Sequence, residues 1–313
     1  MLLIGVDGGG THSRLAACDE KGNIVAHAEC GGINYNAVGM YAAREELASG
    51  VDSILDAAGA DWYDYLAVGM SALDGEATES ELLQFCGDSF ESSRTYLHSD
   101  AHMTLLGATA GGAGIVLISG TGAMGAAIDE AGREYAAGGW GYLLNDEGSG
   151  FDIGSRAVRA AIRASEGGEQ TLLLDMVTEW FGVEKLRDII PVIYSEGFKP
   201  SQLASAARLA DMAAENGDGV ALKILDEAAE SMAFVANSLL SRTGDLPIYT
   251  YGGVFEHSAT YNRRFAGHIS RLRPGVSIAK PKLRPEYGAL ISAASLMGLD
   301  TLEFEANLEK TAK

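Results

Sequence analysis

The sequence predicts an α/β protein built from two similar units that face each other across a cleft. The segment Val6–Ala26 aligns without a gap to Val116–Ala136. Both copies read as an apolar strand, a Gly-Thr turn, a second apolar strand, a D-E-x-G turn and a third strand. Strands then alternate with helical patterns, which is typical of α/β folds. The duplication therefore predicts two glycine-rich turns related by a pseudo-twofold axis.

The first unit opens with this three-strand meander and continues with alternating elements. Strands are expected where short apolar runs end at turns, and helices where apolar residues recur at spacings of three and four. In chain order we predict strands Leu2–Val6, Arg14–Cys18 and Ile24–Glu29, helix Met40–Ala60, strand Tyr65–Met70, helix Glu79–Cys86 and strand Arg94–His98.

The second unit restarts with a strand and meander and is then dominated by helices. The predicted elements after the meander that begins at Gly114–Ser119 are helices Phe151–Ser165, Thr171–Phe181, Ser201–Asn216 and Val220–Ser241, strand Pro247–Tyr251, a helix near Tyr261–Leu272, strand Val276–Ala279 and helix Tyr287–Met297.

The domain boundary is expected at the glycine-rich stretch Ala108–Gly114, which could serve as a hinge. We predict an N-terminal domain over residues 1–110, completed by a C-terminal helix within 287–300. The C-terminal domain is predicted over 111–286, with a helical insertion. The charged tail Thr301–Lys313 is expected to be a surface helix or a frayed end.

Charge and composition exclude several kinds of partner. The chain has 313 residues and a formal net charge of −20, whereas nucleic-acid binding depends on Lys and Arg neutralising phosphates. No signal peptide and no run of 18 apolar residues is present, so we expect a cytoplasmic protein. The cysteines Cys18, Cys30 and Cys86 are isolated and are expected to be reduced and at least partly buried.

Both glycine-rich turns have the chemistry of phosphate binding. They are D-G-G-G-T at Asp7–Thr11 and S-G-T-G-A at Ser119–Ala123. Glycines let backbone N–H groups approach an anion, and two such turns can clamp a polyphosphate, which predicts a phosphoryl-transfer enzyme. Asp7 at a strand end could hold Mg²⁺, usually through water. The alternative is a tight hairpin with a solvated Asp7.

The second turn also matches a dinucleotide-binding pattern, G-x-G-x-x-G, over residues 120–125. That pattern requires a helix to open at the motif, whereas a strand is predicted here, so the dinucleotide interpretation fails. The chain also lacks the G-x-x-x-x-G-K-[ST] pattern of P-loop proteins.

A third motif combines G-G-W-G at Gly138–Gly141 with N-D-E-G-S-G at Asn145–Gly150. Trp140 offers an apolar face to a sugar ring, and Asp146 and Glu147 offer acceptors for its hydroxyls. A helix opening at Phe151 is expected to leave the N–H groups of Gly148 and Ser149 free. The alternative makes Trp140 a core anchor and Asp146 an acid at the helix N-terminus.

Two further positions follow predicted strands. Asp100, after the strand that ends near His98, is placed to take a proton from a substrate hydroxyl, although Asp at such a turn is often a helix cap. Gly252 and Gly253 could pass under a purine or form a simple turn. The six histidines show no zinc-ligand spacing.

Taken in order, these motifs resemble those of the sugar kinase and actin-like ATPase superfamily. The closest likeness is to its branch of N-acetylglucosamine kinases and BadF/BadG/BcrA/BcrD ATPases. The likeness extends from Ile4 to about Met297 and rests on D-G-G-G-T, I-S-G-T-G, G-G-W-G with D-E-G-S, and Y-G-G-V-F. It implies two duplicated ribonuclease-H-like domains around a central cleft for ATP and a sugar.

The resemblance also implies roles for individual residues. Asp100 would be the general base, and Asp7 would support Mg²⁺. ATP would be bound by Gly9, Gly10, Thr11, Gly120, Thr121 and Gly122 at its phosphates and by Gly252 and Gly253 at its adenosine. The sugar would be bound by Asn34, Ser71, Asp100, Gly139, Trp140, Gly141 and Asp146.

The implied activity is transfer of phosphate from ATP to the 6-hydroxyl of an N-acetylated amino sugar. N-acetylglucosamine is the first candidate, with N-acetylmuramic acid or glucosamine next, and homodimers are common among the relatives. Three positions depart from the frequent pattern: His12 stands for Lys, Ser99 for Asn and Ala123 for Ser. Two alternatives stay open: an ATPase activator of a 2-hydroxyacyl-CoA dehydratase or benzoyl-CoA reductase, and a non-catalytic sugar-sensing module.

Overall fold

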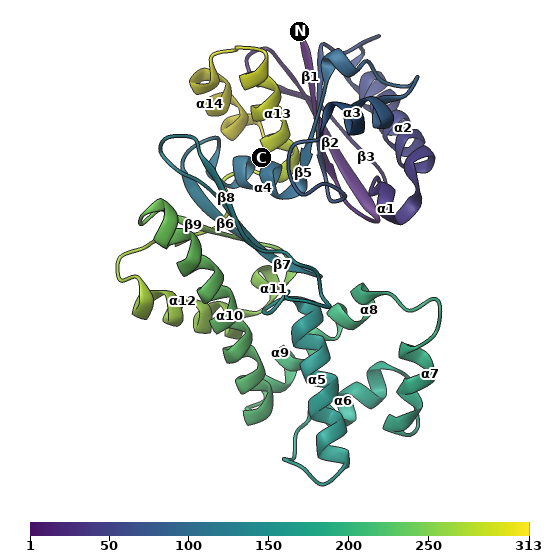
Figure 1. The fold of residues 1–313 in the computed structure, drawn as a ribbon, viewed down its shortest axis with the longest axis vertical. Coiled ribbons are helices and arrows are strands. Elements are labelled where there is room, and N and C mark those ends of the chain that lie inside the picture. The colour runs from purple at the N-terminus through teal and green to yellow at the C-terminus, as the bar shows by residue number, and fades with distance from the viewer. Residues whose placement is uncertain (313) are drawn as a thin grey trace. The chain divides into compact units, whose positions relative to one another are not determined.

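The computed structural model describes residues 1–312, and the chain forms two five-stranded sheets in two separate units (Figure 1). The first unit comprises Met1–Gly114 and the C-terminal segment from Pro281, and the second comprises Ile115–Lys280. The chain therefore leaves the first unit, builds the second and returns.

The two sheets have the same topology, which is the structural counterpart of the sequence repeat. The first has the order β3-β2-β1-β4-β5, and the second has β8-β7-β6-β9-β10 when read in the same sense. Their strands are β1 (Leu2–Gly8), β2 (His12–Asp19), β3 (Ile24–Gly31), β4 (Tyr65–Met70) and β5 (Thr95–Ser99), then β6 (Gly114–Ser119), β7 (Ala123–Ile128), β8 (Glu134–Gly138), β9 (Ile248–Tyr251) and β10 (Ile278–Ala279). The predicted duplicated α/β fold is confirmed.

Strand direction follows the same rule in both units. In the first, β1 and β2 pair antiparallel, as do β2 and β3, whereas β1, β4 and β5 are parallel. In the second, β7 and β8 are antiparallel and β6, β9 and β10 are parallel. Parallel strands bring their carboxyl ends to one edge of a sheet, and residues that follow them are natural site residues.

Helices cover both faces of the first sheet. One hydrophobic cluster joins the sheet to α2 (Met40–Ala58), and the other joins it to α13 (Pro285–Leu296) and α14 (Thr301–Thr311). The remaining helices are α1 (Tyr35–Val38), α3 (Glu79–Cys86), η1 (Ser92–Arg94) and α4 (Asp100–Thr109). Phe304 and Leu308 of α14 are buried, so a frayed end is wrong for this tail.

The second unit carries a helical layer, which Figure 1 shows beside its sheet. One prediction is wrong here, because the segment 201–216 forms two helices and not one. The break lies at the buried Ala206, where Gly154 of the neighbouring helix packs closely against the Leu203 carbonyl. The elements are α5 (Gly150–Ser165), α6 (Leu173–Trp180), η2 (Leu186–Asp188), α7 (Ile189–Ile193), α8 (Pro200–Ser205), α9 (Ala207–Glu215), α10 (Gly219–Thr243), α11 (Gly253–His257) and α12 (Ala259–Leu272).

Two smaller expectations concern thiols and membranes. Cys18 and Cys86 are buried, Cys30 is partly exposed, and all three are unpaired thiols. Across residues 1–312, none of the helices has both the length and the apolar character that a membrane crossing requires.

Candidate active site

Asp7 and Asp100 lie at the carboxyl ends of two parallel strands of the first unit, β1 and β5, which β4 separates. Asp7 lies near the end of β1 and is in register with Gly69 of β4, while Met70 is in register with Ser99 at the end of β5. Asp100 is the next residue and opens α4. The fold thus brings two acids 93 positions apart in the chain (100 − 7) to one edge of the sheet.

Asp7 is a largely buried carboxyl group in an acidic environment. Burial, and after it the nearby charges of Glu286 and Asp100, raise the pKa of Asp7 to about 7, although Arg14 and His12 oppose the rise. Arg14 Nη1 lies 4.0 Å from Asp7 Oδ2, and the Asp7 side chain is 20% exposed. A solvated Asp7 in a simple hairpin is therefore wrong.

Glu286 adds to this negative charge from α13. Its side chain is 2% exposed, one oxygen lies 3.5 Å from Arg284 Nη1, and Oε2 has no hydrogen-bond partner among residues 1–312. Sequence reasoning missed Glu286, since it lies outside the recognised motifs. It makes the neighbourhood of Asp7 attractive to a cation.

Asp100 is not the cap of α4. That role belongs to Ser99, whose Oγ accepts the N–H of His102 at 3.3 Å. Burial raises the pKa of Asp100, while backbone hydrogen bonds at the start of the helix oppose the rise. Since Ser99 satisfies the helix end, the carboxylate of Asp100 is available to accept a proton.

The first glycine turn can form only without side chains. A Cβ on Gly9 would lie 2.5 Å from the His12 carbonyl, and one on Gly32 would lie 2.3 Å from that of Gly10. The N–H of Ile33 donates to the Gly9 carbonyl at 3.1 Å. Thr11 at the tip is exposed. The turn therefore presents a hydroxyl and backbone groups on a closely packed base.

Two residues predicted to bind the sugar meet beside this turn. Asn34 Nδ2 donates to Ser71 Oγ at 3.1 Å, and the backbone N–H of Ser71 donates to the Gly8 carbonyl, also at 3.1 Å. Asn34 also caps α1 by accepting the N–H of Asn36. The first unit thus gathers Asn34 and Ser71 next to its phosphate-type turn.

In the second unit, the other glycine turn is bonded to the start of α5. The N–H of Gly150 donates to the Gly120 carbonyl at 2.8 Å, and the N–H of Phe151 donates to that of Thr121 at 3.3 Å. A Cβ on Gly122 would lie 2.7 Å from Asp146 Oδ2. The turn and the D-E-G-S segment therefore form one structure.

The N–H groups of Gly148 and Ser149 are not free, contrary to expectation. Gly148 donates to Asp152 Oδ2 at 3.0 Å, and Ser149 donates to the Asp146 carbonyl at 3.0 Å. The Gly148 carbonyl accepts the hydroxyl of Tyr261, a buried residue that no motif signalled. These bonds use donors that the sequence alone had left for a ligand.

The G-G-W-G segment exposes its aromatic ring. Trp140 is 70% exposed, so it is not a core anchor. Gly139 and Gly141 on either side both have positive φ, and the N–H of Gly141 donates to Asp146 Oδ1 at 3.2 Å. Asp146 is also not the helix acid, because the acidic residue in the first turn of α5 is Asp152. Burial raises the pKa of Asp146.

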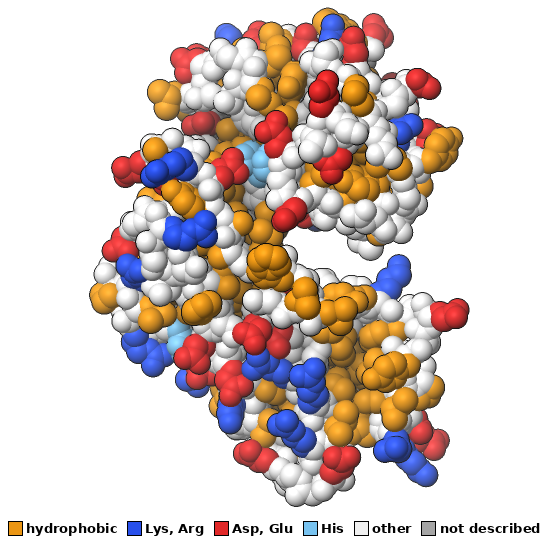
Figure 2. All heavy atoms as spheres, viewed as in Figure 1, with side chains coloured by type: hydrophobic (Ala, Val, Ile, Leu, Met, Phe, Trp, Pro, Cys, Tyr) orange, Lys and Arg blue, Asp and Glu red, His pale blue; other side chains and the backbone are white. Residues whose placement is uncertain are grey.

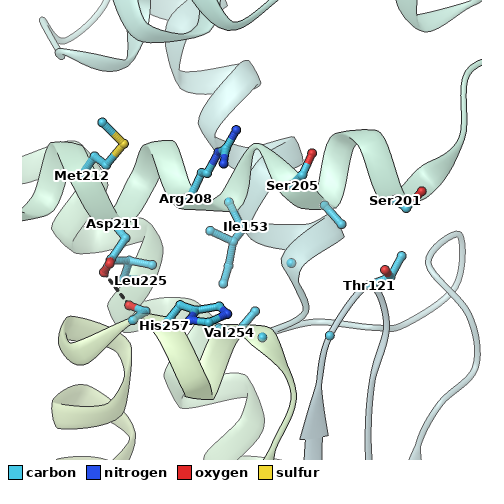
Figure 3. Close-up of a pocket in the computed structure, with 16 residues that line it drawn as sticks. Thr121, Ile153, Ser201, Ser205, Arg208, Asp211, Met212, Leu225, Val254 and His257 are labelled. Carbon is cyan, nitrogen blue, oxygen red and sulfur yellow. Dashed lines mark hydrogen bonds between the residues drawn. The ribbon is translucent and has the colours of Figure 1, made fainter. Parts of the chain in front are cut away.

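A pocket of about 530 Å³ opens next to the second turn (Figure 3). Gly120, Thr121 and Gly253 line it, together with residues of α5, α8, α9, α10 and α11. Gly252 supports it from outside the lining: its φ is 101°, and a Cβ there would lie 2.5 Å from the Ser119 carbonyl. The sequence motifs included Gly150, Gly253 and Val254 of this lining but none of its residues on α8, α9 and α10.

A second hollow of about 790 Å³ lies on α5 and α10 and is lined by charges of both signs. Figure 2 shows acidic and basic side chains interspersed over this unit. Arg156 is held by Asp152 at 2.7 Å and by Glu227 at 3.0 Å. Because its charges pair with one another, this hollow is the weaker candidate for a ligand site.

A known protein family matches nearly the whole chain. Residues 4–293 match the model of the BadF/BadG/BcrA/BcrD ATPase family. The chain belongs to this family. The match includes both glycine turns, both acids and Gly252-Gly253.

Individual relatives agree with the family match. The chain is 29% identical to the N-acetylmuramic acid/N-acetylglucosamine kinase of Clostridium acetobutylicum, covering 94% of this chain and 98% of the relative. It is 28% identical to the N-acetyl-D-glucosamine kinase of Dictyostelium discoideum, covering 93% and 97%. A solved structure described as a candidate N-acetylglucosamine kinase from Chromobacterium violaceum superposes with a TM-score of 0.78 at 26% identity, covering 93% and 98%.

Proposed function

We propose that this protein is an ATP-dependent kinase that phosphorylates the 6-hydroxyl of an N-acetylated amino sugar, with N-acetylglucosamine the first candidate. The observation that carries the proposal is the pair of partly buried acids with raised pKa values, Asp7 and Asp100, beside a glycine turn in a family of ATPases. Phosphoryl transfer needs little more than positioned phosphates, a cation and one carboxylate at the attacking hydroxyl.

Asp100 is the general base of the proposed reaction. The oxygen of the sugar 6-hydroxyl forms a bond to the γ-phosphorus, and its proton passes to the Asp100 carboxylate. The bond between the γ-phosphorus and the bridging oxygen breaks, and ADP leaves with the electron pair. Burial raises the pKa of Asp100, which makes its carboxylate a better proton acceptor.

Asp7 is the residue that would hold Mg²⁺, directly or through water. The Asp7 carboxyl group fits the ion because it supplies an oxygen ligand and is largely buried. The negative charges of Glu286 and Asp100 lie near it and also favour a cation, and Arg14 is the positive charge beside it. The ion would neutralise charge on the phosphates.

The remaining roles divide between the units. Gly9, Gly10 and Thr11 of the first, and Gly120, Thr121 and Gly122 of the second, would contact phosphates. The pocket beside Gly253 would take the adenosine. The sugar would be bound by Asn34, Ser71, Asp100, Gly139, Trp140, Gly141 and Asp146.

The exposed ring of Trp140 supports a sugar-binding role for this loop over a purely structural role. The ring is 70% exposed and lies among glycines, so it is available to stack on a sugar. The relative from Clostridium acetobutylicum is named for both N-acetylmuramic acid and N-acetylglucosamine, which supports N-acetylmuramic acid as a further candidate substrate. A cytoplasmic location completes the proposal, together with a homodimer as the assembly that is common among the relatives.

The deciding experiment is ADP release with Mg-ATP and a panel of N-acetylglucosamine, N-acetylmuramic acid, N-acetylmannosamine, glucosamine and glucose. We expect strong release with one acetylated sugar. Absence of sugar-stimulated release from folded, ATP-binding protein would refute the amino-sugar kinase and favour an activator or a non-catalytic module.

The matching variant is Asp100→Asn, which keeps size but removes the proton acceptor. We expect kcat to fall about 100-fold to 10,000-fold while sugar binding survives. Asp52→Asn, at an exposed position on α2, is the control for a charge change alone. Unchanged turnover in Asp100→Asn would remove this residue from the mechanism.

A further inference from the structure

The pocket of the second unit has two ends that differ in their lining residues. Figure 3 shows Thr121 at one end, with Asp211 and Met212 at the other. Between these ends the lining is mixed, with the apolar Ile153, Leu225 and Val254 and the polar Ser205, Arg208 and His257. If the phosphates lie at the Thr121 turn, the base of the nucleotide extends toward Asp211. This step rests on the proposed function.

Asp211 is held in a defined orientation at that far end. It lies on α9, and its Oδ1 accepts a short hydrogen bond of 2.5 Å from Ser258 Oγ. Ser258 is the N-cap of α12, and its Oγ also accepts the N–H of Tyr261 at 3.1 Å. The hydroxyl proton is thus committed to Asp211 Oδ1, which fixes the orientation of the carboxylate.

The second oxygen of Asp211 is open to a ligand. Among residues 1–312, Ser258 is the single hydrogen-bond donor to this carboxylate and no cation pairs with it. Arg208, one helical turn earlier and also in the pocket lining, lies over the ring of Trp180 at 3.9 Å. Oδ2 is therefore an acceptor without a protein donor at the end of a pocket of mixed polarity.

We infer that Asp211 selects the nucleobase by accepting a hydrogen bond from the 6-amino group of adenine. A 6-oxo purine in the same position would present a carbonyl oxygen, so two acceptors would face each other without a proton. The site thus favours adenine over hypoxanthine.

The test is direct binding of ADP, IDP and GDP, measured by calorimetry without sugar or turnover. We expect the unmodified protein to bind ADP about tenfold to a hundredfold more tightly than IDP, because one charged hydrogen bond is lost with the 6-oxo base. Equal affinities for ADP and IDP would overturn the inference. Failure to bind any of the three would instead contradict the proposed nucleotide-dependent function.

Asp211→Asn should lower the preference for ADP over IDP toward one, since an amide can turn its NH₂ group to a 6-oxo base. The matched control is Glu215→Gln on the same helix, outside the pocket lining, where the preference should not change. In turnover assays, Asp211→Asn should raise KM for ATP while kcat stays nearly constant. A preserved preference in a folded Asp211→Asn variant would also overturn the inference.

Ser258→Ala tests whether Asp211 must be held in its orientation. Without the Ser258 hydroxyl the carboxylate is free to turn, and the preference for ADP over IDP should fall. Circular dichroism checks that α12 survives the loss of its cap. An unchanged preference in the folded variant would contradict the orienting role of Ser258.

Discussion

The two glycine-threonine turns share one sequence pattern but lie in different environments. In the gapless alignment, Asp7 before the first turn corresponds to Leu117 before the second. Asp7 is a partly buried acid with a raised pKa, whereas Leu117 is a fully buried part of the second core. At this position one copy therefore keeps an ionisable group, and the other has an apolar core residue.

The largest effect on activity is expected from removing the negative charge of Asp7. Asp7→Asn should reduce kcat on the order of a thousandfold, because the loss of a carboxylate near the metal site removes several kcal/mol of transition-state stabilisation. Steady-state kinetics at saturating Mg²⁺ measure it. Asp56→Asn, exposed on α2, should behave as the unmodified protein. A twofold effect at Asp7 would refute its proposed role.

The same substitution should stabilise the ligand-free protein at high pH. The folded pKa of Asp7 is about 7 against an ordinary value of 3.8, so above pH 7 the buried ion destabilises the fold by about 4 kcal/mol, at 1.36 kcal/mol per pKa unit. Protonation of Asp7 removes this destabilisation as the pH falls through 7 toward 4. Urea unfolding of Asp7→Asn should therefore show a gain at pH 8 that becomes much smaller at pH 5. A gain that does not depend on pH would contradict the charge explanation.

The backbone beneath the second turn offers a test of its rigidity. Gly252→Ala should destabilise the protein by about 1–3 kcal/mol, because φ is 101° and the new Cβ would meet the Ser119 carbonyl at 2.5 Å. Gly120→Ala is the control, since its Cβ would meet nothing within 4 Å. Denaturant midpoints compare the two. Equal stabilities would show that the Gly252 backbone relaxes freely.

The smallest predicted effect concerns the exposed ring of the second unit. Trp140→Ala should raise KM for the sugar about tenfold, the loss expected for one aromatic stacking contact, and should leave the melting temperature unchanged. Trp62→Ala, at a ring that is 59% exposed in the first unit, should change neither quantity. An unchanged KM in Trp140→Ala would remove the ring from the sugar site.

Most strands and the duplicated fold were predictable because local periodicity and turn residues specify them. The prediction Tyr65–Met70 matches β4 to the residue. The helix 201–216 failed because its division at Ala206 depends on how closely α5 approaches, which no local pattern reports. Likewise, Ser99 rather than Asp100 caps α4, a choice between adjacent residues that side-chain geometry decides.

The sequence by itself determined the repeat, the α/β class, both glycine turns and the acids that follow the strands, since these depend on short-range pattern. Tertiary structure alone decided the rest. It placed Glu286 of α13 near Asp7, bonded the N–H groups of Gly148 and Ser149 within the loop, and set Asp211 against Ser258. Charge, hydrogen bonding and burial act between atoms that are close in space, and distance along the chain does not show which atoms those are.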